Sequence, residues 1–286
     1  MFNLTINSTN VVNSLNNMYQ YQFKNGAFEV PANAEMMITS FQIPYSWYNI
    51  TTRYNNNSFK IYWPNGAVGN YTAFTLTLDD GFYTVNALNA RIQMFCIEKG
   101  MYLTDGSGNN VYYISITPNS TAYANQIITK LIPLSLPAGY SAPTNFAGYA
   151  TTTRRPPYIE ILSTNNFGKF LGFTSGNYGI TQIADYNVLS NIIPQGTTVN
   201  SLLVKCSLVN NGTSNQSDIL DAFAIGGSSG GTFGGNLNYT NTIEKFVRIA
   251  EGRYNNFIIT IVDQNNNDIS ILDNNLLINF LIRVKK

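Results

Sequence analysis

The fold is decided near the C-terminal end of the chain by SLLVKCSL (residues 201–208), FIITIV (residues 257–262) and LLINFLIRV (residues 276–284). In the first segment, Leu202, Val204 and Cys206 fall on one side of an extended chain, and mostly polar residues fall on the other. This alternation is typical of a strand with one buried face. FIITIV is apolar on both faces and rich in β-branched residues, which favours a strand inside a sheet.

The rest of the chain adds further strand candidates and one convincing helix. Thr84 can cap that helix, Leu88, Ile92 and Phe95 recur at helical spacing, and Gly100 supplies a left-handed stop. About ten strand candidates with one helix predict an all-β protein, either a sandwich or a barrel, with the helix covering one end or face of the sheets.

Two segments lack a regular pattern. Residues 133–157 hold no periodicity, which indicates an extended surface loop, or alternatively a small inserted subdomain, in an irregular region that continues to about residue 198. At the other end, Phe2, Leu4 and Ile6 alternate with polar residues ahead of an Asn- and Ser-rich stretch. We interpret residues 1–17 as an N-terminal arm that leads into the first strand.

Composition excludes several classes of function. The chain has 286 residues, a formal net charge of +1 and only 11% charged residues, so no basic surface for nucleic acid is expected. A surface so poor in charge fits a subunit that hides much of itself in an assembly. A/T-rich coding, which favours Asn, Ile, Tyr and Phe, would explain the same composition.

The chain contains no histidine, which excludes Ser-His-Asp triads and His-ligated metal sites. Its two cysteines, Cys96 and Cys206, lack any metal-ligand spacing. Cys206 lies on the apolar face of its predicted strand, so we expect a buried free thiol. No cofactor and no metal are predicted.

Carboxylates offer weak alternatives. Asp79 and Asp80 could supply part of a glycosidase acid pair with Glu160, but a DDG sequence is more often a turn. Residues 263–268 imitate the start of a calcium loop without its central glycine and terminal glutamate, which favours a hairpin turn. No catalytic residues are predicted.

The N-terminal sequence has neither a basic nor an apolar signal region, and no apolar stretch is long enough to span a membrane. We therefore expect a protein that is neither secreted nor membrane-spanning.

Several short motifs, taken in their order and spacing, resemble the penton, or minor capsid, proteins of virophages and Polinton-like viruses. Upstream they are IPYSWYNIT (residues 43–51) and LDDGFYTVNALNARI (residues 78–92). Downstream they are LGF (171–173), CSLVNN (206–211), SDILDAFAI (217–225), GRYNNFIITIVDQ (252–264) and LLINFLIRVK (276–285).

This resemblance implies a single jelly-roll β-sandwich of two facing antiparallel sheets, spanning residues 1–286, with one short covering helix and long loops. It implies a structural, non-enzymatic capsid protein of the virion, assembled in the host cytoplasm. Five copies would form the homopentameric capsomer at the fivefold vertices, beside capsomers of the major capsid protein, without specific nucleic-acid contacts.

The last predicted strand suggests where copies would meet. Leu277, Leu281 and Arg283 lie on its face away from the core, which is mixed rather than polar. We hypothesise that these three residues contact a neighbouring subunit, and that Phe2, Leu4 and Ile6 make arm contacts within the shell.

Two other functions share the pattern. A carbohydrate- or receptor-binding jelly-roll module would use exposed Tyr and Trp side chains to stack on sugars, and the fold alone does not separate it from a capsid subunit. A glycoside-hydrolase-like enzyme would need paired acidic residues in a cleft.

Overall fold

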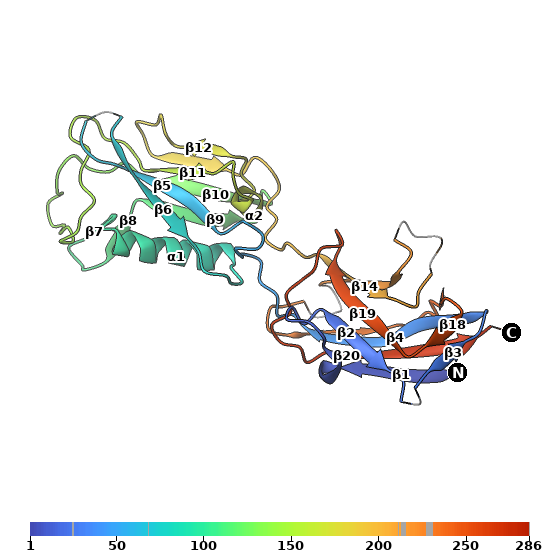
Figure 1. Cartoon of the computed structure of the whole chain (residues 1–286). Coiled ribbons are helices and arrows are strands. Elements are labelled where there is room, and N and C mark those ends of the chain that lie inside the picture. The colour runs from blue at the N-terminus through green and yellow to red at the C-terminus, as the bar shows by residue number, and fades with distance from the viewer. Residues whose placement is uncertain (25, 68, 211, 213–215, 227–230, 286) are drawn as a thin grey trace. The chain divides into compact units, whose positions relative to one another are not determined.

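The computed structural model describes residues 1–24, 26–67, 69–210, 212, 216–226 and 231–285. The chain forms two compact units (Figure 1). The jelly-roll unit comprises Met1–Trp47 and Val199–Lys286, and the inserted unit comprises Tyr48–Thr198. Each unit has its own core and is described by itself.

The jelly-roll unit contains two principal antiparallel sheets, here called the first and the second sheet. The first sheet has the order β1 (Phe2–Asn7), β20 (Leu277–Val284), β4 (Ala34–Pro44) and β16 (Asn236–Thr240), with β17 (Val247–Arg248) also paired to β4. The second sheet has the order β15 (Ile219–Ala224), β14 (Ser201–Cys206), β19 (Asn256–Asp263) and β2 (Met18–Gln22). A short 3-10 turn, η1 (Ser8–Asn10), follows β1, and β3 (Phe28–Val30) pairs with β18 (Gly252–Tyr254).

The order of these strands defines the fold. When the eight principal strands are numbered along the chain, the first sheet has the order 1-8-3-6 and the second has the order 2-7-4-5. Two Greek keys wound into facing sheets give this order, which is that of a jelly roll. The predicted jelly-roll β-sandwich is therefore confirmed, and the jelly-roll unit completes it without any strand from the inserted unit.

Side chains from both sheets meet in the core of the jelly-roll unit. The rings of Phe41 on β4 and Phe223 on β15 stack at 4.7 Å, and Phe257 on β19 meets Phe280 on β20 edge to face at 6.2 Å. On β14, Leu202, Val204 and Cys206 are fully or almost fully buried, as their alternation predicts. Burial of these large apolar side chains is the main force that holds the two sheets together.

The described residues of the inserted unit form a four-stranded, a three-stranded and a two-stranded antiparallel sheet and two helices. Its four-stranded sheet has the order β12 (Gly176–Tyr178), β11 (Tyr158–Ile161), β5 (Ser58–Pro64) and β6 (Tyr71–Thr77). The three-stranded sheet has the order β13 (Tyr186–Leu189), β10 (Ala124–Thr129) and β9 (Ile114–Asn119), and β7 (Tyr102–Thr104) pairs with β8 (Asn110–Tyr112). The helices are α1 (Val85–Glu98) and α2 (Phe167–Leu171).

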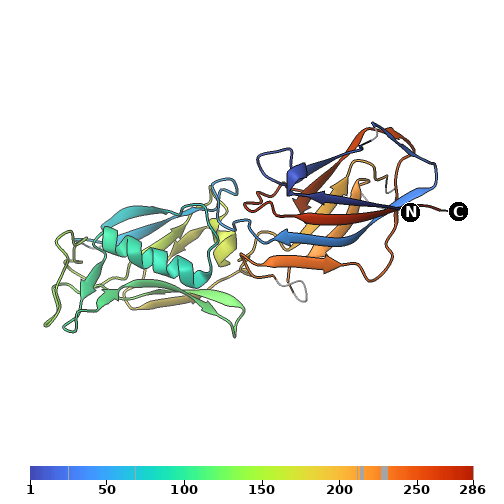
Figure 2. The same ribbon diagram turned by 90° about the horizontal axis from the view of Figure 1, so that it is seen from below.

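Helix α1 has the ends that the sequence predicts. The Thr84 side chain accepts a hydrogen bond from the backbone N–H of Ala87 at 3.1 Å, and Gly100 has a φ of 67°. Leu88 and Ile92 are fully buried in the core of the inserted unit, with Phe95 almost so. Figure 2 shows α1, the teal helix, lying along the sheets of the inserted unit.

The structure corrects the expected domain organisation. The sequence predicts a single jelly roll spanning residues 1–286, and it offers a small inserted loop region at about residues 133–198 as an alternative to a plain surface loop. Instead, the chain leaves the jelly roll after β4 and returns at β14, and Tyr48–Thr198 forms the inserted unit between them. In residues 58–77 apolar and polar residues alternate as they do in the jelly-roll strands. This alternation indicates that one face of a strand is buried, but it does not indicate which sheet or helix covers that face.

The predicted N-terminal arm is a strand of the sandwich. Residues 2–7 form β1, which runs antiparallel to β20 with Ile6 opposite Ile278. Phe2, Leu4 and Ile6 share the face that points into the jelly-roll unit, and Ile6 is fully buried there. Leu4 is half-buried and Phe2 is 50% exposed, so burial of this face decreases towards the N-terminus, and the arm contacts of Phe2, Leu4 and Ile6 stay a prediction. Among the described residues, neither helix is long and apolar enough to cross a membrane.

Candidate functional site

The outer face of β20 is the candidate site of subunit contact. Strand β20 lies between β1 and β4, so its outward side chains occupy the middle of the first sheet. Leu277 is 39% exposed, and Leu281 is half-buried beside Met37 of β4 and Asn3 of β1. The structure thus brings Leu277, Leu281 and Arg283 onto one face, as predicted.

Uncharged polar groups surround these leucines. The Thr5 hydroxyl on β1 donates to the Asn279 side-chain oxygen at 2.8 Å, and the Asn279 side-chain nitrogen donates to the Ser40 hydroxyl on β4 at 2.8 Å. These two hydrogen bonds link the neighbouring strands β1, β20 and β4, so that the polar side chains have one another as hydrogen-bond partners. Because the groups carry no charge and already have partners, covering them costs little desolvation free energy.

Arg283 has its partners within the same subunit. Its Nε donates to Glu35 at 3.1 Å, and a terminal nitrogen donates to Glu244 at 2.9 Å. The guanidinium also lies 3.5 Å from the centre of the Phe246 ring, a cation–π contact. The positive charge of Arg283 is therefore neutralised inside the jelly-roll unit, and the part of the predicted contact that is open to a neighbour consists of Leu277 and Leu281.

Sequence reasoning did not find the partners of Arg283. Glu35 and Glu244 lie in distant segments, and neither belongs to a recognisable motif. The available signal was the arginine itself, because a guanidinium on an otherwise uncharged strand face favours a nearby carboxylate.

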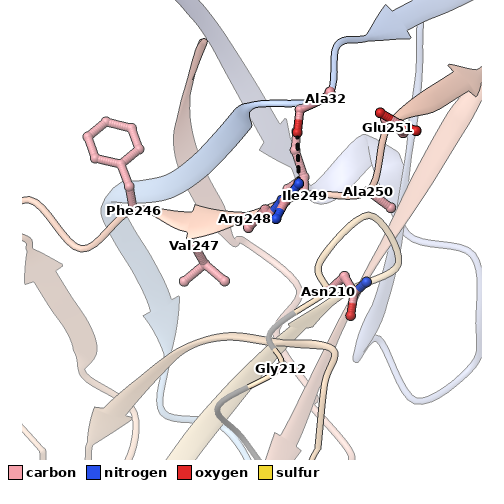
Figure 3. A pocket seen from close by; sticks show the side chains of 9 residues that line it. All are labelled: Ala32, Asn210, Gly212, Phe246, Val247, Arg248, Ile249, Ala250 and Glu251. Atoms are coloured by element: carbon pink, nitrogen blue, oxygen red, sulfur yellow. Dashed lines mark hydrogen bonds between the residues drawn. The ribbon is translucent and has the colours of Figure 1, made fainter. Parts of the chain in front are cut away.

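A hollow of about 780 Å³ in the jelly-roll unit is lined by nine residues, among them Phe246, which also packs against Arg283 (Figure 3). Arg248 donates to the carbonyl oxygen of Ala32 at 3.2 Å across it, and Phe246 and Glu251 point away from each other. Its wall reaches Gly212, whose neighbours on both sides lie outside the described residues. No set of polar side chains converges within the part of the hollow that the structure describes.

Two of the three carboxylates considered for catalysis, Asp80 and Glu160, are held by structural contacts. Asp80 accepts hydrogen bonds from the backbone N–H and hydroxyl of Thr52, each at 2.7 Å. Glu160 accepts from the Tyr62 hydroxyl at 2.7 Å and lies 3.5 Å from the Lys60 amine.

The loop after β19 is a turn, as predicted. Asp263 accepts the backbone N–H groups of Asn265 and Asn267, each at 2.8 Å. Within the described ranges, no three His, Cys, Asp or Glu side chains form a group that could hold a metal ion.

Both cysteines are free thiols, one in each unit. Cys96 of α1 and Cys206 of β14 are buried, and burial raises the pKa of each thiol to about 12. A buried neutral thiol behaves as a small apolar side chain and is chemically inert. The prediction for Cys206 is confirmed.

Comparison with known proteins gives a likeness in structure. No family model and no curated protein matches the chain. Among solved structures, the mavirus penton protein is 11% identical with a TM-score of 0.47, covering 99% of each chain. A chain of the Sputnik virophage is 12% identical with a TM-score of 0.39, covering 94% of this chain and 92% of that one.

Proposed function

We propose that the protein is a structural capsid subunit that assembles into the pentameric capsomer at the fivefold vertices of a virion. The observation that carries this proposal is the outer face of β20, where Leu277 and Leu281 lie among uncharged, hydrogen-bonded side chains in the middle of a sheet. A sheet face that meets water normally carries charges, whereas the centre of a protein–protein contact is depleted of them.

The internal pairing of Arg283 supports burial of this face. An unpaired guanidinium would oppose burial, because moving its charge out of water costs several kcal/mol. This cost is on the order of the free energy that a small apolar contact gains by burial. Since Glu35 and Glu244 already neutralise it, a neighbour can cover the face without leaving a charge alone.

The geometry of a ring sets a further requirement. A cyclic pentamer uses two different patches on each subunit, because head-to-tail contacts close the ring. A stable contact hides roughly 800 Å² per partner, more than one strand supplies. The outer face of β20 would therefore form the centre of one patch, with adjoining parts of the first sheet around it.

In this role the subunit would lie beside capsomers of the major capsid protein, following assembly in the host cytoplasm, and would carry out no catalysis. The oligomeric mass of the purified full chain tests the proposal. Sedimentation velocity should give a species of five times the chain mass of 31.7 kDa. A protein that stays monomeric at concentrations of tens of micromolar would contradict it.

A further inference from the structure

The inserted unit carries a second surface that the proposed capsid function does not use. It lies on the outer face of the four-stranded sheet, opposite the side chains that fill the core of the unit. A cavity of about 310 Å³ opens there. Its lining residues come from three strands and three connecting segments: Tyr62, Gly69, Tyr71, Arg155, Tyr158 and Ile180.

Three tyrosines form a fixed aromatic wall. Tyr62 and Tyr158 are cross-strand partners on β5 and β11, and their rings stack at 4.4 Å with an angle of 6° between planes. Tyr71 of β6 meets the Tyr158 ring edge to face at 4.9 Å. Rings held by neighbouring strands lose little freedom when a ligand packs on them, so the wall is preorganised for binding.

Two polar atoms at this cavity have no hydrogen-bond partner among the described residues. They are Nε of Arg155 and the hydroxyl of Tyr71, and both atoms are buried. Each unsatisfied buried group costs about 1–3 kcal/mol, so native structures usually provide a partner or reserve the group for a ligand.

Arg155 is half-buried, whereas the other arginines without a side-chain hydrogen bond among the described residues, Arg53, Arg154 and Arg253, are exposed. Arg91, Arg248 and Arg283 each donate to an oxygen of the protein. No such bond is present for the Arg155 side chain within the described ranges, and Glu160, the carboxylate on the same sheet face, is already held by Tyr62 and Lys60. The cavity therefore has an uncompensated positive charge beside an aromatic wall.

We propose that this cavity binds one anionic sugar residue of a glycan. The guanidinium of Arg155 would take the carboxylate or sulfate in a forked pair of hydrogen bonds, and the tyrosine rings would pack against the apolar C–H face of the sugar. The tyrosine hydroxyls supply donors and acceptors for sugar hydroxyls. The volume of 310 Å³ lies at the lower end of the range for ligand pockets, which suits a single ring.

The test uses the full-length protein and isothermal titration with three trisaccharide or disaccharide probes: 3′-sialyllactose, 3-sulfated lactose and lactose. We expect one or both anionic sugars to bind at least about tenfold more tightly than lactose, a difference of 1.4 kcal/mol. Which anion binds distinguishes a carboxylate site from a sulfate site. Absence of binding by both anionic probes at millimolar concentration overturns the proposal, as does equal binding of lactose.

Variants assign the binding to the cavity. Arg155→Met should weaken the anionic sugar at least about tenfold, and Tyr71→Phe, which removes only the hydroxyl, should weaken it by less. Arg154→Met is the matched control, because Arg154 is the exposed neighbour of Arg155, and it should leave affinity unchanged.

An equal loss in Arg154→Met would show a nonspecific charge effect and overturn the assignment. If Arg155→Met fails to fold, Arg155→Lys replaces it. Lysine keeps the positive charge but cannot form the forked pair of hydrogen bonds, so this variant should still lose most of the affinity for the anionic sugar. Sodium glutamate, a carboxylate without a sugar ring, should not compete; full competition by glutamate would overturn the choice of a sugar. These results are independent of the proposed capsid function, since the oligomeric mass of the variants should not change.

Discussion

Arg283 on β20 donates through Nε to Glu35 on β4 at 3.1 Å, although 248 positions separate them in the sequence. Glu244 binds the same guanidinium at 2.9 Å, and Phe246 packs beneath it. The last strand of the jelly roll is thus fastened to the third principal strand by a charged cluster as well as by backbone bonds.

Arg283→Met should lower the free energy of unfolding of the jelly-roll unit by about 1 kcal/mol, because Glu35 and Glu244 lose a shared partner at a partly exposed site. Urea unfolding followed by Trp47 fluorescence, in a Trp63→Phe background, measures this unit alone, since each unit holds one of the two buried tryptophans. Arg253→Met, at an exposed arginine, is the control. An equal loss in that control would refute the role of the cluster.

Leu277→Lys and Leu281→Lys should each abolish the pentamer, because a lysine at the centre of the proposed contact must be desolvated without a partner. Sedimentation velocity should show monomers, and the far-UV circular dichroism should not change. Leu272→Lys places the same substitution at another exposed leucine, 49% exposed and outside β20. Pentamers that persist in the two β20 variants would argue against the contact.

Ile6→Ala should destabilise the jelly-roll unit by about 2–4 kcal/mol, since its side chain is fully buried opposite Ile278. Asn3→Ala, at an exposed position of the same strand, should change stability by less than about 0.5 kcal/mol. Urea midpoints of the two variants give the comparison. Equal stability of Ile6→Ala and the wild type would mean that β1 does not form in solution.

Cys96 and Cys206 should not react with a thiol reagent at pH 8 in the folded protein. With a pKa of about 12, roughly one thiol in ten thousand is ionised at that pH. Because the folded state binds these protons more tightly than the unfolded chain, its stability should fall as pH rises from about 8.5 towards 12. Two thiols should become reactive in urea, one with each unit; fast labelling without urea would contradict the burial.

Local patterns in the sequence predict the strands well. Leu202, Val204 and Cys206 alternate with mostly polar residues, and the structure buries all three in β14. The helix from Val85 to Glu98 has the predicted cap at Thr84. In each case the decisive contacts are made within a few residues or by one face of one element, so a single segment carries the information.

The arrangement of strands among sheets could not be predicted in the same way. Phe59, Ile61 and Trp63 alternate as clearly as the β14 residues, yet they fill the core of the inserted unit. The alternation indicates that one face of a strand is buried, but it does not indicate which element packs against that face. The boundary at Tyr48 has no glycine- or proline-rich linker to mark it.

The candidate sites depend on still longer connections. The face carrying Leu277 and Leu281 was predictable because it belongs to one strand. The cavity of the inserted unit was not, because Tyr71, Arg155 and Tyr158 meet only after β5 has paired with both β6 and β11. Three separate tyrosines in a chain that contains 19 of them do not indicate a binding site in the sequence.

The position of β20 in the first sheet also determines when the jelly roll can be completed during synthesis. Among the eight principal strands of the jelly roll, β20 is the last to be synthesised, and both β1 and β4 form their ladders against it. The inserted unit, in contrast, is complete once Thr198 has emerged, so it can fold while translation continues. Its folding also shortens the flexible chain that must close before β4 and β14 join the same sandwich. A chain interrupted before residue 277 therefore has neither a finished jelly roll nor the face carrying Leu277 and Leu281.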